Sequence, residues 1–170
     1  MSVIYETQLS ARSAADSVLR DLWDEDLYPV DPFKIADKLG VRVLYGDLPE
    51  DVSGMLRAQD GQVTMYIDTD ESARRQRFTA AHELGHYVQR QRAGADLAKL
   101  AFIDRRSDMA RRGSDTHEIY ANEFAACLLM PASAVRRLHN QGWHDWEMAR
   151  FFDVSPASMT YRLRNLGLER

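Results

Sequence analysis

The sequence is poor in cysteine, in long apolar runs and in excess charge of either sign. Cys127 is the one cysteine among 170 residues, so no intrachain disulfide can form and a reducing compartment is indicated. No apolar run approaches the length of a membrane span, and the first residues lack the basic and apolar segments of a signal peptide. A net charge of −4 gives no general attraction to nucleic acid or membranes. These absences predict a cytoplasmic protein that does not use a membrane.

The remaining composition is that of an ordinary globular chain. With 170 residues, 45% of them hydrophobic and 28% charged, the chain is long enough for about one domain with its own core. Its periodicity predicts an α+β fold that is mostly helical, with a small sheet of about three strands. Helices are expected at about 10–23, 32–39, 71–90, 98–103, 115–130, 132–139 and in two segments of 143–168 that are broken near 153–156. Asp31 and Pro32 form a good N-cap and first-turn pair for the second of these helices. Strands are expected at 41–45, 53–57 and 63–67, with a hairpin turn at Asp60-Gly61.

The most informative pattern is His82-Glu83-Leu84-Gly85-His86, inside a stretch of helical character. Histidines four residues apart project from the same helix face, so both imidazole rings can reach one metal ion. The glutamate between them lies off that face and can act as a general base toward an attacking water. The other interpretation is two ordinary histidines on a helix. The complete pattern favours a hydrolytic metal centre in which Glu83 is the catalytic base.

Two histidines leave a catalytic zinc short of one ligand, because such sites use three protein ligands and a water. A third histidine six residues after His86 is excluded, since Arg92 occupies that position. A glutamate from a second, packed helix remains, and the helix expected from about residue 115 offers Glu118 and Glu123. We expect Glu118 to bind the metal. Asn122, one turn later on the same face, is expected to orient one of the metal ligands without binding the metal itself. Glu123 lies on another face of that helix and is expected to be solvated.

Two long motifs of the chain are similar to those of a known family. The segments Phe78 to His86 and Glu118 to Pro131 resemble the ImmA/IrrE family of zinc metallopeptidases, and so do Pro29 to Pro32 and Ser53-Gly54. The resemblance covers roughly Val30 to Leu168, which is most of the chain. The chain is expected to be a short form of the family, without the C-terminal sensory domain of longer members.

This resemblance implies a thermolysin-like zinc-peptidase core in which His82, His86 and Glu118 bind the metal and Glu83 is the base. It implies zinc as cofactor, with manganese as an alternative, and a helix-turn-helix transcriptional repressor as the protein substrate. Cleavage would relieve repression of mobile-element or stress genes. The alternative is a non-catalytic, zinc-stabilised protein that sequesters a partner or belongs to a toxin–antitoxin pair. Glu83 and an open fourth metal position favour the enzyme, because a structural site needs neither.

The C-terminal segment, residues 143–170, resembles a helix-turn-helix and is expected to be a subdomain of a single metallopeptidase domain spanning 1–170. Arg162 and Arg164 fall on its second helix, where a DNA-binding module would contact bases. Acidic neighbours dilute this positive charge and no basic stripe is present. Direct DNA binding is therefore not favoured, and a packing role is the preferred interpretation.

Several other features have roles that the residues leave open. Tyr120 or His117 could donate a hydrogen bond to the oxyanion, although packing is the commoner role of a helical tyrosine. The strand at 63–67 is either an exposed edge that binds substrate or an ordinary internal strand. Residues 91–115 form either a solvated connector or a flap over the site. Cys127 lies among apolar neighbours and is expected in the core.

Overall fold

A mixed four-stranded sheet forms one side of the molecule, in the order β1-β3-β2-β4. The outer strand β1 runs parallel to β3, while β2 is antiparallel to both β3 and β4. The strands are β1 (Arg42–Gly46), β2 (Val52–Gln59), β3 (Gln62–Asp68) and β4 (Ala101–Arg105). The computed structural model of the chain describes residues 2–24, 26–99, 101–105 and 115–169.

The predicted hairpin between β2 and β3 is confirmed. Asp60 and Gly61 both have positive φ angles, 52° and 79°, as the central residues of a type I′ turn require. The flanking residues Gln59 and Gln62 pair directly across the turn. This local signal places two strands side by side and gives β3 a central place in the sheet.

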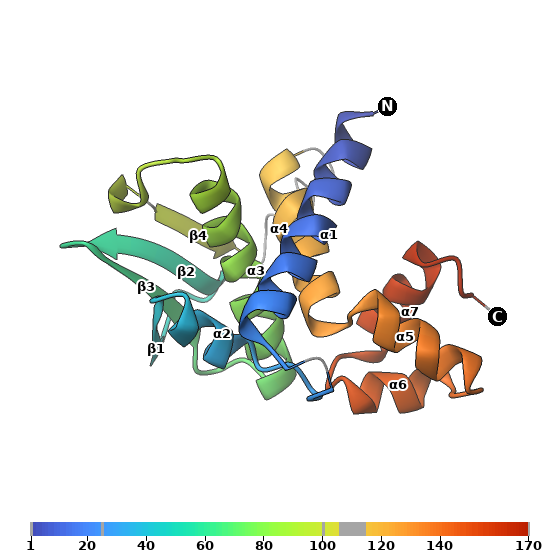
Figure 1. Cartoon of the computed structure of the whole chain (residues 1–170). Helices are drawn as coiled ribbons and strands as arrows, with labels where there is room; N and C mark the ends of the chain where they lie inside the picture. Colours follow the sequence, from blue (N-terminus) through green and yellow to red (C-terminus); the bar gives the residue numbers. More distant parts are fainter. Residues whose placement is uncertain (1, 25, 100, 106–114, 170) are drawn as a thin grey trace.

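Four helices are stacked on the sheet or on one another (Figure 1). The helix α3 packs against β2 and β3 on one side and against α4 on the other, and α1 covers the far side of α4. The short helix α2 packs against α3 and β1. These helices are α1 (Val3–Leu22), α2 (Pro32–Lys38), α3 (Ala73–Arg92) and α4 (Thr116–Leu129). Because α3 and α4 lie inside this stack, both are surrounded by protein over most of their length.

Capping residues fix where these helices begin. Asp31 accepts hydrogen bonds from the amides of Phe33 and Lys34, so Asp31 and Pro32 start α2 as the sequence predicts. Ser72 caps α3 by accepting from the amide of Arg75. The first helix, α1, begins at Val3, several residues before the predicted start near residue 10.

The chain ends in three shorter helices, α5 (Ala132–Asn140), α6 (Asp145–Phe151) and α7 (Pro156–Asn165). The last two pack against each other and are separated by a turn at Phe152–Ser155, as expected from the sequence. No described helix is both long and apolar enough to cross a lipid bilayer.

The predicted fold class, a mostly helical α+β protein with a small sheet, is confirmed. From the sequence, the strand at 63–67 was either an exposed edge or an internal strand. It is internal, since β3 is paired on both sides and the sheet edges are β1 and β4. One local expectation differs from the structure. Residues 98–103 were expected to be helical, whereas only a short 3-10 turn forms at Leu97–Lys99 and the fourth strand follows from Ala101. Within the connector 91–115, residues 106–114 lie outside the described part of the chain.

Candidate metal centre

The central part of α3 is buried on every face. All ten residues from Thr79 to Val88 are buried, among them the polar side chains His82, Glu83 and His86. The sheet covers one side of this stretch and α4 covers the other. Burying polar side chains is unfavourable unless they are bonded to partners or to an ion. Three such residues within five positions therefore mark this turn of α3 as a candidate functional site.

The two histidines face each other across one turn of the helix. Their side chains are only 1% and 2% exposed, and the Nε2 atoms of His82 and His86 lie 3.1 Å apart. Their rings meet edge to face, with centroids 4.8 Å apart. The i, i+4 spacing therefore brings one nitrogen of each ring to the same point, as the sequence predicts.

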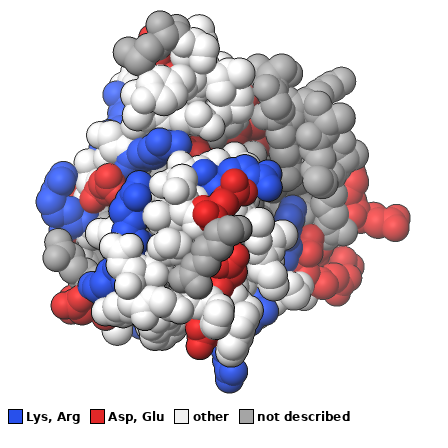
Figure 2. Space-filling view, turned by 90° about the vertical axis from the view of Figure 1, so that its right-hand side faces the viewer, with Lys and Arg blue, Asp and Glu red and all other residues white. Residues whose placement is uncertain are grey.

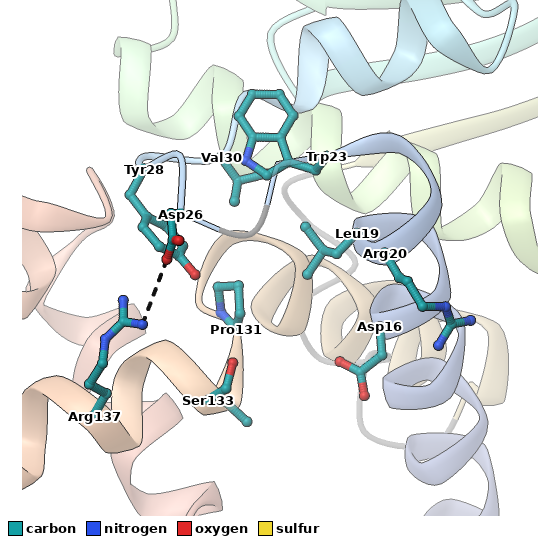
Figure 3. A pocket seen from close by; sticks show the side chains of 11 residues that line it. Asp16, Leu19, Arg20, Trp23, Asp26, Tyr28, Val30, Pro131, Ser133 and Arg137 are labelled. Atoms are coloured by element: carbon teal, nitrogen blue, oxygen red, sulfur yellow. Dashed lines mark ion pairs between the residues drawn. The ribbon is translucent and has the colours of Figure 1, made fainter.

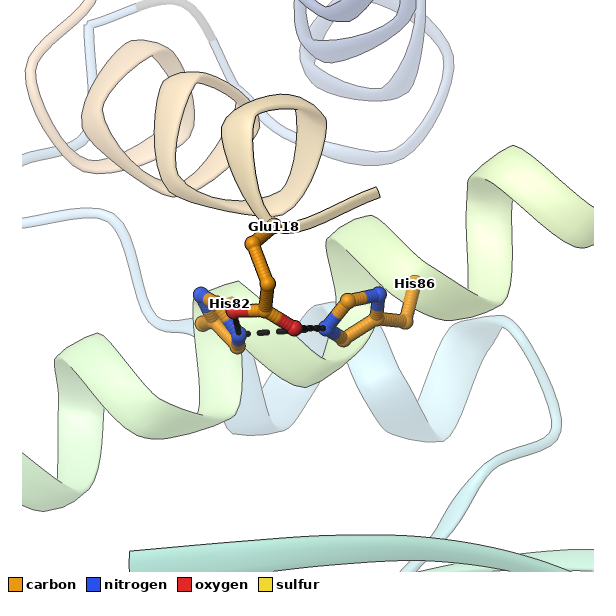
Figure 4. Close-up of side chains that lie close together, drawn as sticks. All are labelled: His82, His86 and Glu118. Carbon is orange, nitrogen blue, oxygen red and sulfur yellow. Dashed lines mark hydrogen bonds and ion pairs between the residues drawn. The ribbon is translucent and has the colours of Figure 1, made fainter. Parts of the chain in front are cut away.

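Glu118 reaches the same point from the first turn of α4 (Figure 4). Asp115 caps α4 by accepting a hydrogen bond from the amide of His117, so Glu118 lies close to the helix N-terminus. One carboxylate oxygen of Glu118 is 3.3 Å from His82 Nε2, and the other is 3.1 Å from His86 Nε2. The Glu118 side chain is 22% exposed, so the site opens to solvent on this side.

These distances fit a bound metal ion. Two ligands about 2.0–2.1 Å from a zinc ion at a tetrahedral angle lie about 3.3 Å apart. The donor atoms of His82, His86 and Glu118 all lie within 4.8 Å of one another, and the closest approaches are 3.1–3.3 Å. Two nitrogens and a carboxylate form the ligand set of many catalytic zinc sites. The described residues could therefore provide three ligands to one metal ion.

Asn122 controls which nitrogen of His82 faces the centre. The Oδ1 atom of Asn122 accepts a hydrogen bond from His82 Nδ1 at 3.0 Å. With its proton on Nδ1, the neutral imidazole presents the Nε2 lone pair to the metal position. Without a cation, that lone pair would face the carboxylate of Glu118, which is also an acceptor. The predicted orienting role of Asn122 thus agrees with the geometry.

The carboxyl group of Glu118 is held in its ionised form. Burial by itself raises its pKa. Without a metal ion, the protonated rings of His82 and His86 can donate hydrogen bonds to the carboxylate, and these bonds and their positive charge more than offset the effect of burial. The net result is a pKa below the ordinary value for glutamate. Glu118 is therefore a carboxylate at neutral pH, which is the form that binds metal.

A glycine between the histidines allows α3 and α4 to approach closely. A Cβ atom on Gly85 would lie 2.8 Å from Ala121 Cα and 3.2 Å from Phe124 Cβ. On the sheet side, a Cβ atom on Gly54 of β2 would overlap the methyl group of Thr79. Only a residue without a side chain fits at each contact. The close helix crossing brings Glu118 within reach of the histidines.

Glu83 is fully buried, at 0% exposure, on the turn of α3 that carries His82. Its Cγ atom lies 3.5 Å from the position that a Cβ on Gly54 would occupy, so it is close to β2. The motif glutamate therefore lies on the sheet side of α3.

The contacts of three other residues considered from the sequence involve groups other than the three donor atoms. Tyr120 is buried and stacks on Phe124, with ring centroids 6.4 Å apart, and burial raises the pKa of its hydroxyl. His117 is exposed and its Nδ1 lies 2.9 Å from Gln89 Oε1. Cys127 is in the core, as expected.

Glu123 was expected to be solvated, and this is wrong. It is only 3% exposed, because α1 covers the side of α4 opposite to α3. Its Oε1 accepts a 2.7 Å hydrogen bond from Arg12 Nε of α1 and lies 3.8 Å from a guanidinium nitrogen of Arg162 of α7. Cys127 donates a weak hydrogen bond to the same oxygen. The sequence spacing contains no signal for this three-helix cluster.

The positions of the two C-terminal arginines do not favour base contacts. Arg162 is 2% exposed and donates to the carbonyl oxygen of Met130 at 2.9 Å. Arg164 is exposed and pairs with Glu169 at 2.8 Å. On the face toward α5, α6 and α7, basic side chains alternate with acidic and uncharged ones (Figure 2). The described residues of that face form no continuous basic stripe of the kind that binds DNA.

Comparison with known proteins identifies similar chains. The sequence model of a peptidase family, described as the IrrE N-terminal-like domain, matches residues 36–164. A solved structure of a Mycobacterium tuberculosis transcriptional regulator matches with a TM-score of 0.64 and 16% identity, over 96% of this chain and 52% of that chain. The chain thus spans about half the length of that regulator, and the likeness is one of fold. No curated protein matches the chain.

Proposed function

Because the chain belongs to the peptidase family of IrrE N-terminal-like domains, we propose that it is a zinc-dependent endopeptidase that cleaves a helix-turn-helix transcriptional repressor. The observation that carries the proposal is the meeting of His82, His86 and Glu118 donor atoms at 3.1–3.3 Å, one residue from Glu83. A structural zinc site is closed by four protein ligands, whereas three ligands and a neighbouring carboxylate suit hydrolysis. Manganese is the alternative metal.

The chemistry assigns a distinct role to each side chain. A zinc ion held by the three ligands would supply a Lewis acid for the scissile carbonyl and the attacking water. Glu83 accepts the proton of that water and passes it to the leaving amine. Asn122 keeps the ring of His82 in the tautomer and orientation that binding requires. A donor to the oxyanion, from Tyr120 or His117, remains part of the proposal.

The biological part of the proposal is relief of repression of mobile-element or stress genes. It is supported by the family and by the fold likeness to a protein described as a transcriptional regulator. Residues 1–170 would act as one metallopeptidase domain with 143–170 as its C-terminal subdomain. The buried position of Arg162 supports a packing role for that subdomain rather than contact with DNA.

The test is incubation of the purified protein, loaded with zinc or manganese, with candidate helix-turn-helix repressors, beginning with any that is encoded next to it. We expect one discrete cut, which Glu83→Gln abolishes while the variant still binds the metal. Glu6→Gln, an exposed glutamate on α1, is the matched control and should cut at the normal rate. His86→Ala should lose both metal and cleavage. Full activity of Glu83→Gln would refute the proposed mechanism.

The same experiment distinguishes the alternative function, a binding protein without catalysis, from the proposed peptidase. A tight complex with the repressor and no cut with either metal would favour a zinc-stabilised binding protein. Such a protein would act by sequestering its partner or as part of a toxin–antitoxin pair. In that case Glu83→Gln and the unaltered protein should bind the repressor equally well.

A further inference from the structure

A cavity of about 670 Å³ lies directly beside the candidate metal centre. Its walls come from the start of α3, the second half of α4 and the region from Val154 to Tyr161 that contains the start of α7. Two lining residues contact the proposed metal ligand His82. Asn122 is hydrogen-bonded to it, and the ring centroids of Phe78 and His82 are 6.5 Å apart. Clefts of this volume commonly hold ligands larger than one amino-acid side chain.

The interior of this cavity is mainly apolar. Ala126, Leu129 and Met130 of the α4 region form one wall, and Val154 lies on the opposite side. Tyr161 stands at the rim with 50% of its surface exposed. An aromatic side chain exposed at the rim of an apolar cavity is a common anchor for peptides.

Among the described residues that line the cavity, one arginine at the rim forms no ion pair. Arg74 is neutralised by Asp153, with Nε 2.9 Å from Oδ1. Arg75, also on the rim, forms no ion pair with another residue that the structure describes. A carboxylate on a bound molecule would complement its charge.

We propose that this cavity is the substrate-recognition pocket, and that it binds a peptide segment with a bulky apolar side chain next to an acidic residue. The apolar side chain would fill the space between Leu129, Val154 and Tyr161, and the carboxylate would pair with Arg75. Because Phe78 and Asn122 both contact His82, this segment would lie beside the ring of that proposed metal ligand. The inference rests on the proposed peptidase function and names the substrate class of the same site.

This assignment gives the C-terminal helices a specific function. The wall that they form is held in place by Arg162, whose Nε donates to the carbonyl oxygen of Met130 at the end of α4. The helix-turn-helix-like segment 143–170 would then serve peptide recognition. Changes in α7 should alter which peptides bind without changing the metal ligands.

A second cavity, of about 520 Å³, lies between α1 and the start of α5 and provides a comparison (Figure 3). Its lining includes charged side chains, among them Asp16, Arg20 and Asp26, and none of the three metal-site residues. Arg137 and Asp26 pair across it at 3.9 Å. It is therefore a control region, with a similar size but no connection to the chemistry.

The test uses the zinc-loaded Glu83→Gln protein, which binds without cutting, to select from phage-displayed random peptides. We expect enrichment of peptides that pair a bulky apolar residue with a neighbouring Asp or Glu. Ala157→Trp, at an exposed position of the pocket wall, should weaken binding of a selected peptide about tenfold or more. Ser133→Trp is the matched control, since Ser133 is also the second residue of its helix but lines the other cavity. It should leave the affinity unchanged.

Two further variants examine the rim. Arg75→Gln should remove the preference for an acidic residue while keeping the apolar one, and Arg42→Gln on β1 should have no effect. Tyr161→Ala should weaken binding without filling the cavity, which tests the pocket independently if Ala157→Trp folds poorly. The inference is overturned if no such peptides are enriched, or if the selected peptides bind to Ala157→Trp and Tyr161→Ala as well as to the parent.

Failure of the pocket and failure of the peptidase can be told apart. If selected peptides depend on Ala157 and Tyr161 but the unaltered protein cuts neither them nor the repressor, the pocket is supported and the proposed activity is not. If the unaltered protein cuts the repressor and both pocket variants do so with the same KM, the activity stands and the pocket assignment is wrong.

Discussion

Gly85 of α3 and Ala121 of α4 are packed so closely that a Cβ atom on Gly85 would lie 2.8 Å from Ala121 Cα. Because the obstructing atom belongs to the backbone, it cannot rotate away. Gly85→Ala would gain about 1 kcal/mol in helix propensity but lose about 1–3 kcal/mol through overpacking. We expect a net loss of stability and a wider spacing of the two helices, which moves Glu118 away from His82 and His86.

Zinc affinity and chemical denaturation of the Gly85→Ala variant measure both effects. Gly46→Ala on β1 is the matched control, because a Cβ atom there meets no atom within 4 Å and the residue has no positive φ angle. The control should bind zinc normally. Unchanged zinc affinity in Gly85→Ala would contradict the dependence of the site on this helix crossing.

Asn122→Ala should lower zinc affinity by about 10–100-fold, the usual effect of losing a group that orients a metal-binding histidine. The reason is that His82 Nδ1 loses the acceptor 3.0 Å away that fixes its proton. Asn122→Asp keeps an acceptor at this position and should retain most of the affinity. Competition with a chromophoric chelator measures the three proteins side by side. Equal zinc affinities of all three proteins would show that Asn122 has no role in metal binding.

Arg162→Ala should destabilise the fold by about 3–5 kcal/mol, because it leaves the buried carboxylate of Glu123 with one cationic partner fewer. It also leaves the carbonyl oxygen of Met130 without its donor. Urea denaturation gives the free energy of unfolding. Arg164→Ala, on the same helix but exposed and paired with Glu169, is the control and should unfold like the parent.

The thiol of Cys127 should be almost inert in the folded protein. Burial raises its pKa to about 12, and the neighbouring carboxylate of Glu123 adds to the effect. The reactive thiolate is therefore scarce at neutral pH, and the group is 2% exposed. A thiol reagent should label one group per chain rapidly in denaturant and very slowly under native conditions. Rapid native labelling would mean that the core between α1, α4 and α7 opens readily.

The candidate metal site could be predicted from the sequence because its residues follow local helical spacing. His82 and His86 lie one turn apart on any α-helix, and so do Glu118 and Asn122. Local signals also placed the cap at Asp31 and the turn at Asp60-Gly61. That the two helices meet followed from the ligand count and from resemblance to a family, and the structure brings the residues together.

The features that were missed depend on contacts between distant segments. The burial of Glu123 requires both Arg12 and Arg162, which lie 111 and 39 residues away along the chain. The central place of β3, which the sequence left open, depends on β1 pairing with it in parallel, and no local pattern specifies that pairing. The strand at Ala101–Arg105 likewise forms because β2 offers a free edge, not because its own sequence alternates clearly.

The helix α1 lies wholly before residue 36, where the match to the family begins, yet it covers the back of the helix that carries Glu118. The segment that matches the family is therefore shorter than the segment that folds as one unit. A version trimmed to the matched region would expose the apolar side of α4 to water and separate Glu123 from Arg12. Anyone preparing a minimal active fragment should keep the first helix, although the family signature does not include it.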